Sequence, residues 1–163
     1  VAGSLASGGR FNIGGAQETN ISLFDSLSKK ACLYAASSRD CARAEAGWPL
    51  GSAEEYKIIP KRPLLLWDLS KVANDLRWPG LTALIGSAPL GTRWQLQKTP
   101  LAPQLLAHFL RDIGGEGLTY PSTKKNDDHI LAFFVSDDRN AKELFSIERL
   151  PSSDAQMSFE LSV

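Results

Sequence analysis

The chain has 163 residues, of which 43% are hydrophobic and 22% are charged, proportions that are ordinary for one globular domain. Lysine plus arginine balance aspartate plus glutamate at 18 each, so no basic field favours a polynucleotide partner, and the longest apolar runs, such as 64–67, are too short to span a bilayer. No signal peptide pattern opens the chain and its one methionine is Met157, so we expect a processed product or a domain excised from a longer protein.

Residues 8–15, GGRFNIGG, place Arg10 between two pairs of glycines. A guanidinium presents a planar fork of donors that matches a phosphate, and glycines let backbone N–H groups approach the same anion. A glycine-rich surface turn with a solvated arginine is the alternative, and it is favoured if the segment is taken alone. The segment lacks the G-K-[ST] of a Walker loop and is no convincing dinucleotide-binding fingerprint.

A strand and a helix are expected next. ACLYAAS at 31–37 suits a buried strand, and Ser38 offers an N-cap to a helix at 39–46. Tyr34 is the one large ring with a polar tip in this strand, and Glu45 stands among alanines that leave room close by. Taken singly, they would be a core tyrosine with a satisfied hydroxyl and an exposed helix glutamate.

The cysteines and histidines are too few and too scattered for a convincing zinc cluster. Cys32 and Cys41 stand nine residues apart, and only His108 and His129 could join them. We expect the two cysteines to be small buried hydrophobic side chains, with a disulfide between them as the alternative.

The middle of the chain predicts strands at 55–59 and 63–68, a short helix at 69–76 and a long helix at 99–113. The long helix is expected to end at a pair of glycines. One apolar stripe is expected on it, formed by Leu101, Leu105, Leu106, Phe109, Leu110 and Ile113.

Four further strands are expected, at 117–121, 129–135, 143–150 and 157–163. A polar loop from Thr123 to Asp128 joins the first two. Ser122 stands at the end of the first, where a turn serine is the plain interpretation. The mixture predicts an α+β fold with more strand than helix.

Three segments, in order, resemble the signature segments of the RES-domain toxins: GGRFN at 8–12, LYAASSRDCARAEA at 33–46 and GLTYPS at 117–122. The family is named for an arginine, a glutamate and a serine, which map onto Arg10, Glu45 and Ser122. The tyrosine of the second segment maps onto Tyr34, eleven residues before Glu45. The resemblance runs from about residue 8 to residue 134, although each motif is weak alone.

The resemblance implies a single compact α+β domain over residues 1–163, with mixed sheets and a few helices, related to the ADP-ribosyltransferase fold. Family members break the bond between nicotinamide and ribose in NAD⁺. The chain is thus expected to be a bacterial toxin that takes NAD⁺ as substrate, without a cofactor or metal, and is neutralised by a cognate antitoxin or immunity protein. It is expected to act in the bacterial cytoplasm, as half of a toxin–antitoxin pair or as a secreted effector domain, with no nucleic acid or membrane as partner.

The resemblance also implies roles for the catalytic residues. Arg10 would grip the pyrophosphate, and Glu45 would stabilise the oxocarbenium-like charge that forms on the ribose. Tyr34 would stack on the nicotinamide, and Ser122 would hydrogen-bond its carboxamide or the ribose. Further substrate-binding residues are expected at Gly9, Phe11, Asn12, Tyr120 and His129.

Two other functions compete with destruction of NAD⁺. An ADP-ribosyltransferase that modifies a specific target protein would use the same arginine, tyrosine and glutamate. Such enzymes typically carry E-x-E or Q-x-E, whereas Arg43 and Ala44 precede Glu45 here, which favours a glycohydrolase or phosphorylase. A catalytically dead binding module is disfavoured because the arginine, tyrosine, glutamate and serine are all present.

Overall fold

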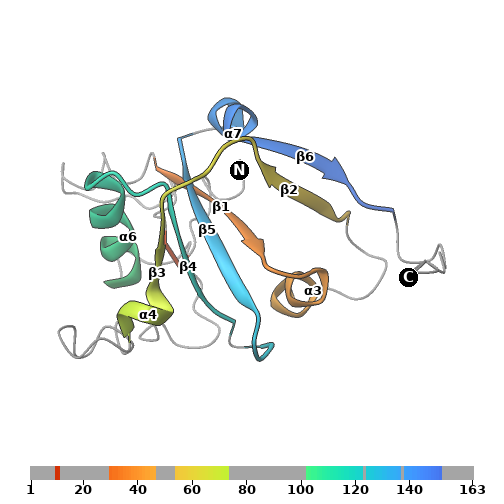
Figure 1. Ribbon diagram of the computed structural model, residues 1–163, viewed down its shortest axis with the longest axis horizontal. Helices are drawn as coiled ribbons and strands as arrows, with labels where there is room; N and C mark the ends of the chain where they lie inside the picture. Colours follow the sequence, from red (N-terminus) through yellow and green to blue (C-terminus); the bar gives the residue numbers. More distant parts are fainter. Residues whose placement is uncertain are drawn as a thin grey trace, which may run out of the picture.

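A four-stranded sheet forms the centre of the computed structural model, which describes residues 10–11, 30–46, 54–73, 102–122, 124–136 and 138–151 (Figure 1). Its strand order is β1 (Ala31–Ala36), β5 (His129–Val135), β4 (Gly117–Pro121) and β3 (Leu66–Asp68). β5 is antiparallel to both of its neighbours, whereas β3 is parallel to β4. The carboxyl-terminal ends of β1 and β4 therefore lie at the same end of the sheet, beside the first residues of β5.

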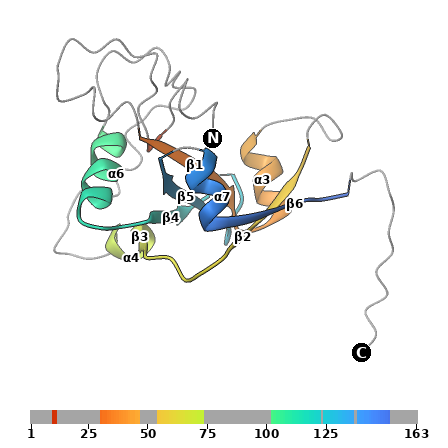
Figure 2. The same cartoon turned by 90° about the horizontal axis from the view of Figure 1, so that it is seen from above.

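A smaller antiparallel pair, β2 (Tyr56–Pro60) and β6 (Phe145–Arg149), lies beside this sheet. The helix α7 (Asp138–Leu144) leads directly into β6. In Figure 1, α7 and β6 run along the upper side of the picture, and in Figure 2, which is seen from above, α7 lies in front of the central strands.

Three more helices of the described ranges lie around the central sheet. α3 (Arg39–Ala46) follows β1, α4 (Leu69–Ala73) follows β3, and α6 (Ala102–Asp112) precedes β4. Figure 1 shows α4 and α6 beside β3, and α3 at the far end of β1. None of the helices in the described ranges is long and apolar enough to cross a membrane.

The alternation of side chains along the strands divides the buried side chains of the described residues into two clusters, one on each face of the sheet. Ile130, Ala132 and Phe134 of β5 face a cluster that contains Phe11, Tyr120 and parts of α3, α4 and α6. Phe133 and Val135 face the other cluster, with Ala31, α7 and Phe145. The segment around Arg10 and the helix that carries Glu45 therefore pack on the same face.

Most predicted elements are confirmed where they fall on described residues. The strands expected at 31–37, 117–121 and 129–135 are β1, β4 and β5, and the capped helix at 39–46 is α3. The strand expected at 157–163 and the predicted N-cap of α6 at Thr99 lie outside the described residues.

Three strand predictions began too early. The strand expected at 55–59 is β2, which begins one residue later, at Tyr56. β3 starts at Leu66 rather than at residue 63, because the Leu65 N–H donates to the Glu116 carboxylate, 3.0 Å away, instead of to a neighbouring strand. The segment expected as a strand from 143 contributes its first two residues to α7, so β6 begins at Phe145.

The single apolar stripe expected on α6 is wrong in part. Leu110 is buried and Leu106 packs against the core, but Leu105, Phe109 and Ile113 are 45%, 56% and 49% exposed. The buried face contains Pro103, Gln104, Ala107 and Leu110 instead. Arg111 fixes this orientation, since its guanidinium donates to the Ala31 carbonyl at 2.6 Å and lies 4.8 Å from the centre of the Phe134 ring.

The predicted glycine stop of α6 is confirmed. Gly114 adopts a left-handed backbone with φ 90°, and its N–H donates to the Arg111 carbonyl at 3.0 Å. The next N–H, of Gly115, donates to the Leu110 carbonyl at 2.9 Å. A Cβ atom at Gly115 would come within 2.7 Å of Trp67, so this glycine also permits close packing of the helix end on β3.

Candidate functional site

Arg10 lies over the ring of Tyr120, with the guanidinium carbon 5.7 Å from the ring centre. The ring of Phe11 meets the same tyrosine edge-on, with centroids 5.0 Å apart. Phe11 and Tyr120 are only 2% and 8% exposed, whereas Arg10 is half-buried. The aromatic pair therefore anchors the segment in the core and supports a guanidinium that reaches toward the surface.

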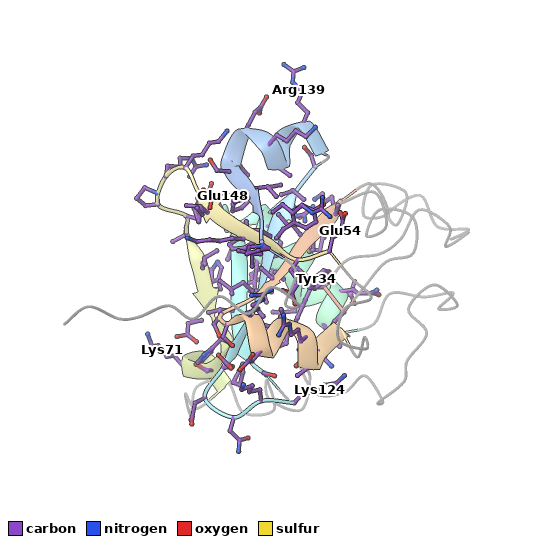
Figure 3. All side chains as sticks on the ribbon, turned by 90° about the vertical axis from the view of Figure 1, so that its right-hand side faces the viewer. Tyr34, Glu54, Lys71, Lys124, Arg139 and Glu148 are labelled. Atoms are coloured by element: carbon purple, nitrogen blue, oxygen red, sulfur yellow. The ribbon has the colours of Figure 1, made fainter. Side chains whose placement is uncertain are left out.

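The backbone of Phe11 is held from both sides by β1. Its N–H donates to the Tyr34 hydroxyl at 2.9 Å, and its carbonyl accepts a bond from the Cys32 thiol at 3.4 Å. Both side chains point to one face because they stand two residues apart on a strand. Figure 3 shows Tyr34 among the strands. The position of Arg10 is thus set by its neighbour's main chain.

Glu45 and Ser122 meet across the site. The Ser122 hydroxyl donates to Glu45 Oε1 at 2.7 Å, and it accepts the N–H groups of Lys124 and Lys125, each at 3.1 Å. A hydroxyl has one proton and two acceptor positions. Because both acceptor positions are occupied by backbone donors, the one proton of Ser122 is directed at the carboxylate.

The charges of Arg10 and Glu45 both act on Tyr120. Burial raises the pKa of the Tyr120 hydroxyl, the positive charge of Arg10 opposes this shift, and the negative charge of Glu45 adds to it. Two signature residues that are 35 positions apart in the sequence therefore lie close to one buried ring.

The two side chains that hold Phe11 are neutral at physiological pH. Burial raises the pKa of the Cys32 thiol to about 12, and burial also raises the pKa of Tyr34 well above its ordinary value. Both keep their protons and act as hydrogen-bonding groups rather than as nucleophiles.

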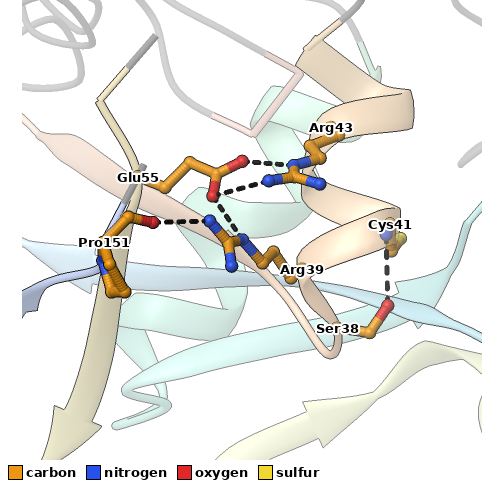
Figure 4. A network of polar contacts seen from close by, with 6 residues as sticks. All are labelled: Ser38, Arg39, Cys41, Arg43, Glu55 and Pro151. Atoms are coloured by element: carbon orange, nitrogen blue, oxygen red, sulfur yellow. Dashed lines mark hydrogen bonds and ion pairs between the residues drawn. The ribbon is translucent and has the colours of Figure 1, made fainter. Parts of the chain in front are cut away.

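The helix that carries Glu45 is fixed at its start and along its outer side. The Ser38 hydroxyl caps α3 by accepting the Cys41 N–H at 3.1 Å. Figure 4 shows Arg39 and Arg43 converging on the Glu55 carboxylate from successive turns of the helix. Hydrogen bonds from Arg43 and Arg39 lower the pKa of Glu55, so this carboxylate stays charged and ties α3 to the segment before β2.

The comparison with protein-family models finds the RES domain over residues 2–156, which is nearly the whole chain. The chain belongs to the RES family. Membership indicates an NAD-related enzyme of toxin type. No curated protein and no solved structure shows a significant similarity to the chain.

Within the RES domain, six of the predicted site residues gather on one face of the sheet. They are Arg10, Phe11, Tyr34, Glu45, Tyr120 and Ser122. Two other predicted contacts, Gly9 and Asn12, lie outside the described residues.

His129 is not brought into this cluster. It opens β5 opposite Pro121, and alternation places its side chain on the face opposite to Ile130 and Tyr120. Its backbone has a different use, because its N–H donates to the Ser37 hydroxyl at 2.9 Å.

Sequence reasoning missed two residues that support the RES cluster, Cys32 and Asp128. Cys32 had a signal, because it stands two positions from Tyr34 and shares its face of a strand. Asp128 had none: its carboxylate accepts hydrogen bonds from Ser37 and Ser38, which are 91 and 90 residues away in the sequence.

Both cysteines of the RES domain are buried, as expected of small hydrophobic side chains, and they do not form the alternative disulfide. Within the described ranges, no three His, Cys, Asp or Glu side chains gather in a way that could hold a metal ion.

Proposed function

We propose that this RES domain is an NAD⁺ glycohydrolase or phosphorylase, which acts as a toxin by breaking the bond between nicotinamide and ribose. The observation that carries the proposal is the Glu45 carboxylate, fixed by Ser122 on the same face as the half-buried guanidinium of Arg10. The opposite charges of Arg10 and Glu45, which both act on Tyr120, match a substrate with an anionic pyrophosphate and a cationic nicotinamide-ribose.

Cleavage of the bond between nicotinamide and ribose requires few protein groups other than correctly placed charges. When the bond between nicotinamide and ribose breaks, its electron pair goes to the nicotinamide nitrogen, which leaves as a neutral ring. Positive charge then develops on the ribose, as in glycoside hydrolysis, and the nearby carboxylate of Glu45 stabilises it. Water adds to the ribose carbon and gives up a proton to solvent, which yields ADP-ribose. With phosphate as acceptor, the product is the phosphorylated sugar.

The contacts favour supporting roles for two residues that the resemblance had placed against substrate. The proton of Ser122 is directed at Glu45, so we assign this serine to orienting the carboxylate rather than to binding nicotinamide or ribose. The Tyr34 hydroxyl accepts the Phe11 N–H, so we assign this tyrosine to holding the segment that carries Arg10.

The context of action rests on family membership alone. We propose that the toxin acts in the bacterial cytoplasm, where NAD⁺ is present, and that a cognate antitoxin or immunity protein neutralises it. Whether the domain reaches that compartment as half of a toxin–antitoxin pair or as a secreted effector would be decided by the genes beside it.

The decisive test is the Glu45→Gln variant, with Glu148→Gln on the exposed face of β6 as the matched control. Nicotinamide release from NAD⁺ is followed by chromatography, first in phosphate-free buffer and then with added phosphate. We expect many turnovers for the wild type and for Glu148→Gln. We expect Glu45→Gln to release nicotinamide roughly 10²–10³-fold more slowly at unchanged thermal stability, because one charge aimed at the developing cation is removed.

Two outcomes would contradict the proposal. A Glu45→Gln variant as active as the control would remove this carboxylate from the mechanism. In a second assay, NAD⁺ labelled in its ADP-ribose part is used. If this NAD⁺ survives until a cell extract is added and the label then appears on one protein, the enzyme is a protein-modifying ADP-ribosyltransferase.

A further inference from the structure

We propose that Asp128 is a positioning residue, which fixes the hydrogen bond between Glu45 and Ser122 from both of its ends. The inference rests on the proposed function for its kinetic consequence, but its structural part can be tested without activity. No signature segment of the sequence contains this aspartate, and its role follows from the contacts of its side chain and its main chain.

The side chain of Asp128 holds the start of the helix that carries Glu45. Its Oδ1 accepts the Ser37 hydroxyl at 2.8 Å, and its Oδ2 accepts the Ser38 hydroxyl at 2.9 Å. The Ser38 oxygen in turn accepts the Cys41 N–H and caps α3. The carboxylate thus orients the capping residue itself, and through it the direction in which α3 leaves β1.

The main chain of Asp128 holds the serine. Its carbonyl accepts the Ser122 N–H at 2.8 Å, which closes the loop between β4 and β5. The N–H groups of Lys124 and Lys125, inside that loop, are the two donors that orient the Ser122 hydroxyl. The loop geometry that Asp128 closes is therefore the geometry that aims the serine proton at Glu45.

The side-chain contacts and the main-chain contact of Asp128 both position the 2.7 Å hydrogen bond between Ser122 and Glu45. Loss of the carboxylate would remove the side-chain contacts, while the hydrogen bond from the Ser122 N–H to the Asp128 carbonyl remains. α3 would stay folded, because Arg39 and Arg43 still bind Glu55 on its outer side. We therefore expect a displaced Glu45 rather than an unfolded domain.

The experiment compares Asp128→Ala and Asp128→Asn with Asp127→Asn. Asp127 is the neighbouring exposed residue, with a left-handed φ of 66° that asparagine tolerates, and is thus a matched control. A misplacement of about 1 Å can cost about 10²-fold in rate, so we expect Asp128→Ala to lower kcat by roughly 10- to 100-fold with KM changed little. Asp128→Asn keeps one acceptor oxygen and should be less affected, and Asp127→Asn should match the wild type.

A double variant separates positioning from a general structural role. If Asp128 acts through Glu45, adding Asp128→Ala to Glu45→Gln should change the residual rate by less than about twofold, because residues that act as a unit are not additive. A further tenfold loss in the Glu45→Gln background would overturn the proposal, as would wild-type kcat in Asp128→Ala.

Hydrogen exchange distinguishes failure of this inference from failure of the proposed function. If the wild-type protein does not cleave NAD⁺, the proposed function fails, yet the amide of Cys41 should still exchange faster in Asp128→Ala than in Asp127→Asn. Equal exchange of this capped amide in the two variants would show that Asp128 does not hold the helix start, and would overturn the inference whatever the activity.

Discussion

Replacing Ser122 with alanine tests whether this residue acts on Glu45 or on the substrate. The substitution removes a hydrogen bond of 2.7 Å to a carboxylate and leaves the N–H groups of Lys124 and Lys125 without their side-chain acceptor. Lys124 is exposed and Ser122 is half-buried, so water can replace part of what is lost. The domain should therefore remain folded.

The magnitude follows from the kind of bond removed. A hydrogen bond to a charged group contributes about 1.5–3 kcal/mol, and about 1.4 kcal/mol corresponds to tenfold in rate. If the whole contribution is used to orient Glu45 in the transition state, kcat should fall by roughly 10- to 150-fold. The KM for NAD⁺ should stay close to the wild-type value if, as we propose, the serine proton is directed at Glu45 and not at the substrate.

The assay is steady-state release of nicotinamide by Ser122→Ala, Ser122→Thr and Ser146→Ala. Threonine keeps the hydroxyl and should recover most of kcat, while the exposed Ser146 on β6 controls for loss of a hydroxyl elsewhere. A raised KM with an unchanged kcat for Ser122→Ala would refute the reasoning. It would show that the serine binds nicotinamide or ribose directly, as the family resemblance first suggested.

Three further predictions concern packing, the buried thiol and acid stability. Leu110→Ala should lower the free energy of unfolding by about 2–5 kcal/mol, whereas Phe109→Ala should change it by less than about 0.5 kcal/mol in the same denaturant titration; the reverse order would show that α6 is rotated. Cys32, whose pKa is raised to about 12 by burial, should resist a thiol reagent at pH 8 until denaturant is added, and fast labelling of the native protein would contradict its burial. Hydrogen bonds from two serine hydroxyls lower the pKa of Asp128, so the stability that this group contributes should be present above pH 4 and disappear as pH falls through the lowered pKa. Asp128→Asn should lack that acid-dependent part of Tm between about pH 2 and 5, and an unchanged acid profile would remove Asp128 from the linkage.

Local sequence signals predicted the central strands and α3 because the physics involved is local. β4 and β5 are short apolar runs bounded by turn residues, and the Ser38 cap acts on an amide only three positions away. The arginine, glutamate and serine of the site came from resemblance to a family rather than from such patterns. The spacing of these three residues along the chain did not indicate that Arg10 lies over Tyr120 or that Ser122 binds Glu45.

Three of the misses share one cause, since each depends on a partner far away in the sequence. The periodicity of α6 could not show which leucines face the sheet, because Arg111 sets that rotation through Ala31, 80 positions earlier. The start of β3 depends on Glu116, 51 positions later. The role of Asp128 depends on serines about 90 positions earlier, so a loop aspartate gave no local sign of it.

The separation of charge in the site leads to one more prediction, about the product. The guanidinium of Arg10 lies over the Tyr120 ring, the Glu45 carboxylate accepts the Ser122 hydroxyl, and both charges influence the pKa of Tyr120. On the proposed function, each charge binds the part of the substrate that has the opposite sign. ADP-ribose keeps the pyrophosphate of NAD⁺ but has lost the cationic nicotinamide. Its binding should therefore depend on Arg10 and not on Glu45.

We expect ADP-ribose to bind more weakly to Arg10→Lys, because lysine cannot offer the planar fork that matches a phosphate bidentately. Its affinity for Glu45→Gln should equal that for the wild type, or rise slightly as a negative charge near the ribose is removed. Calorimetric titration of ADP-ribose into the three proteins measures both effects without any turnover. Equal weakening in Arg10→Lys and Glu45→Gln would show that the two residues share one subsite, and the assignment of the pyrophosphate to Arg10 alone would then be wrong.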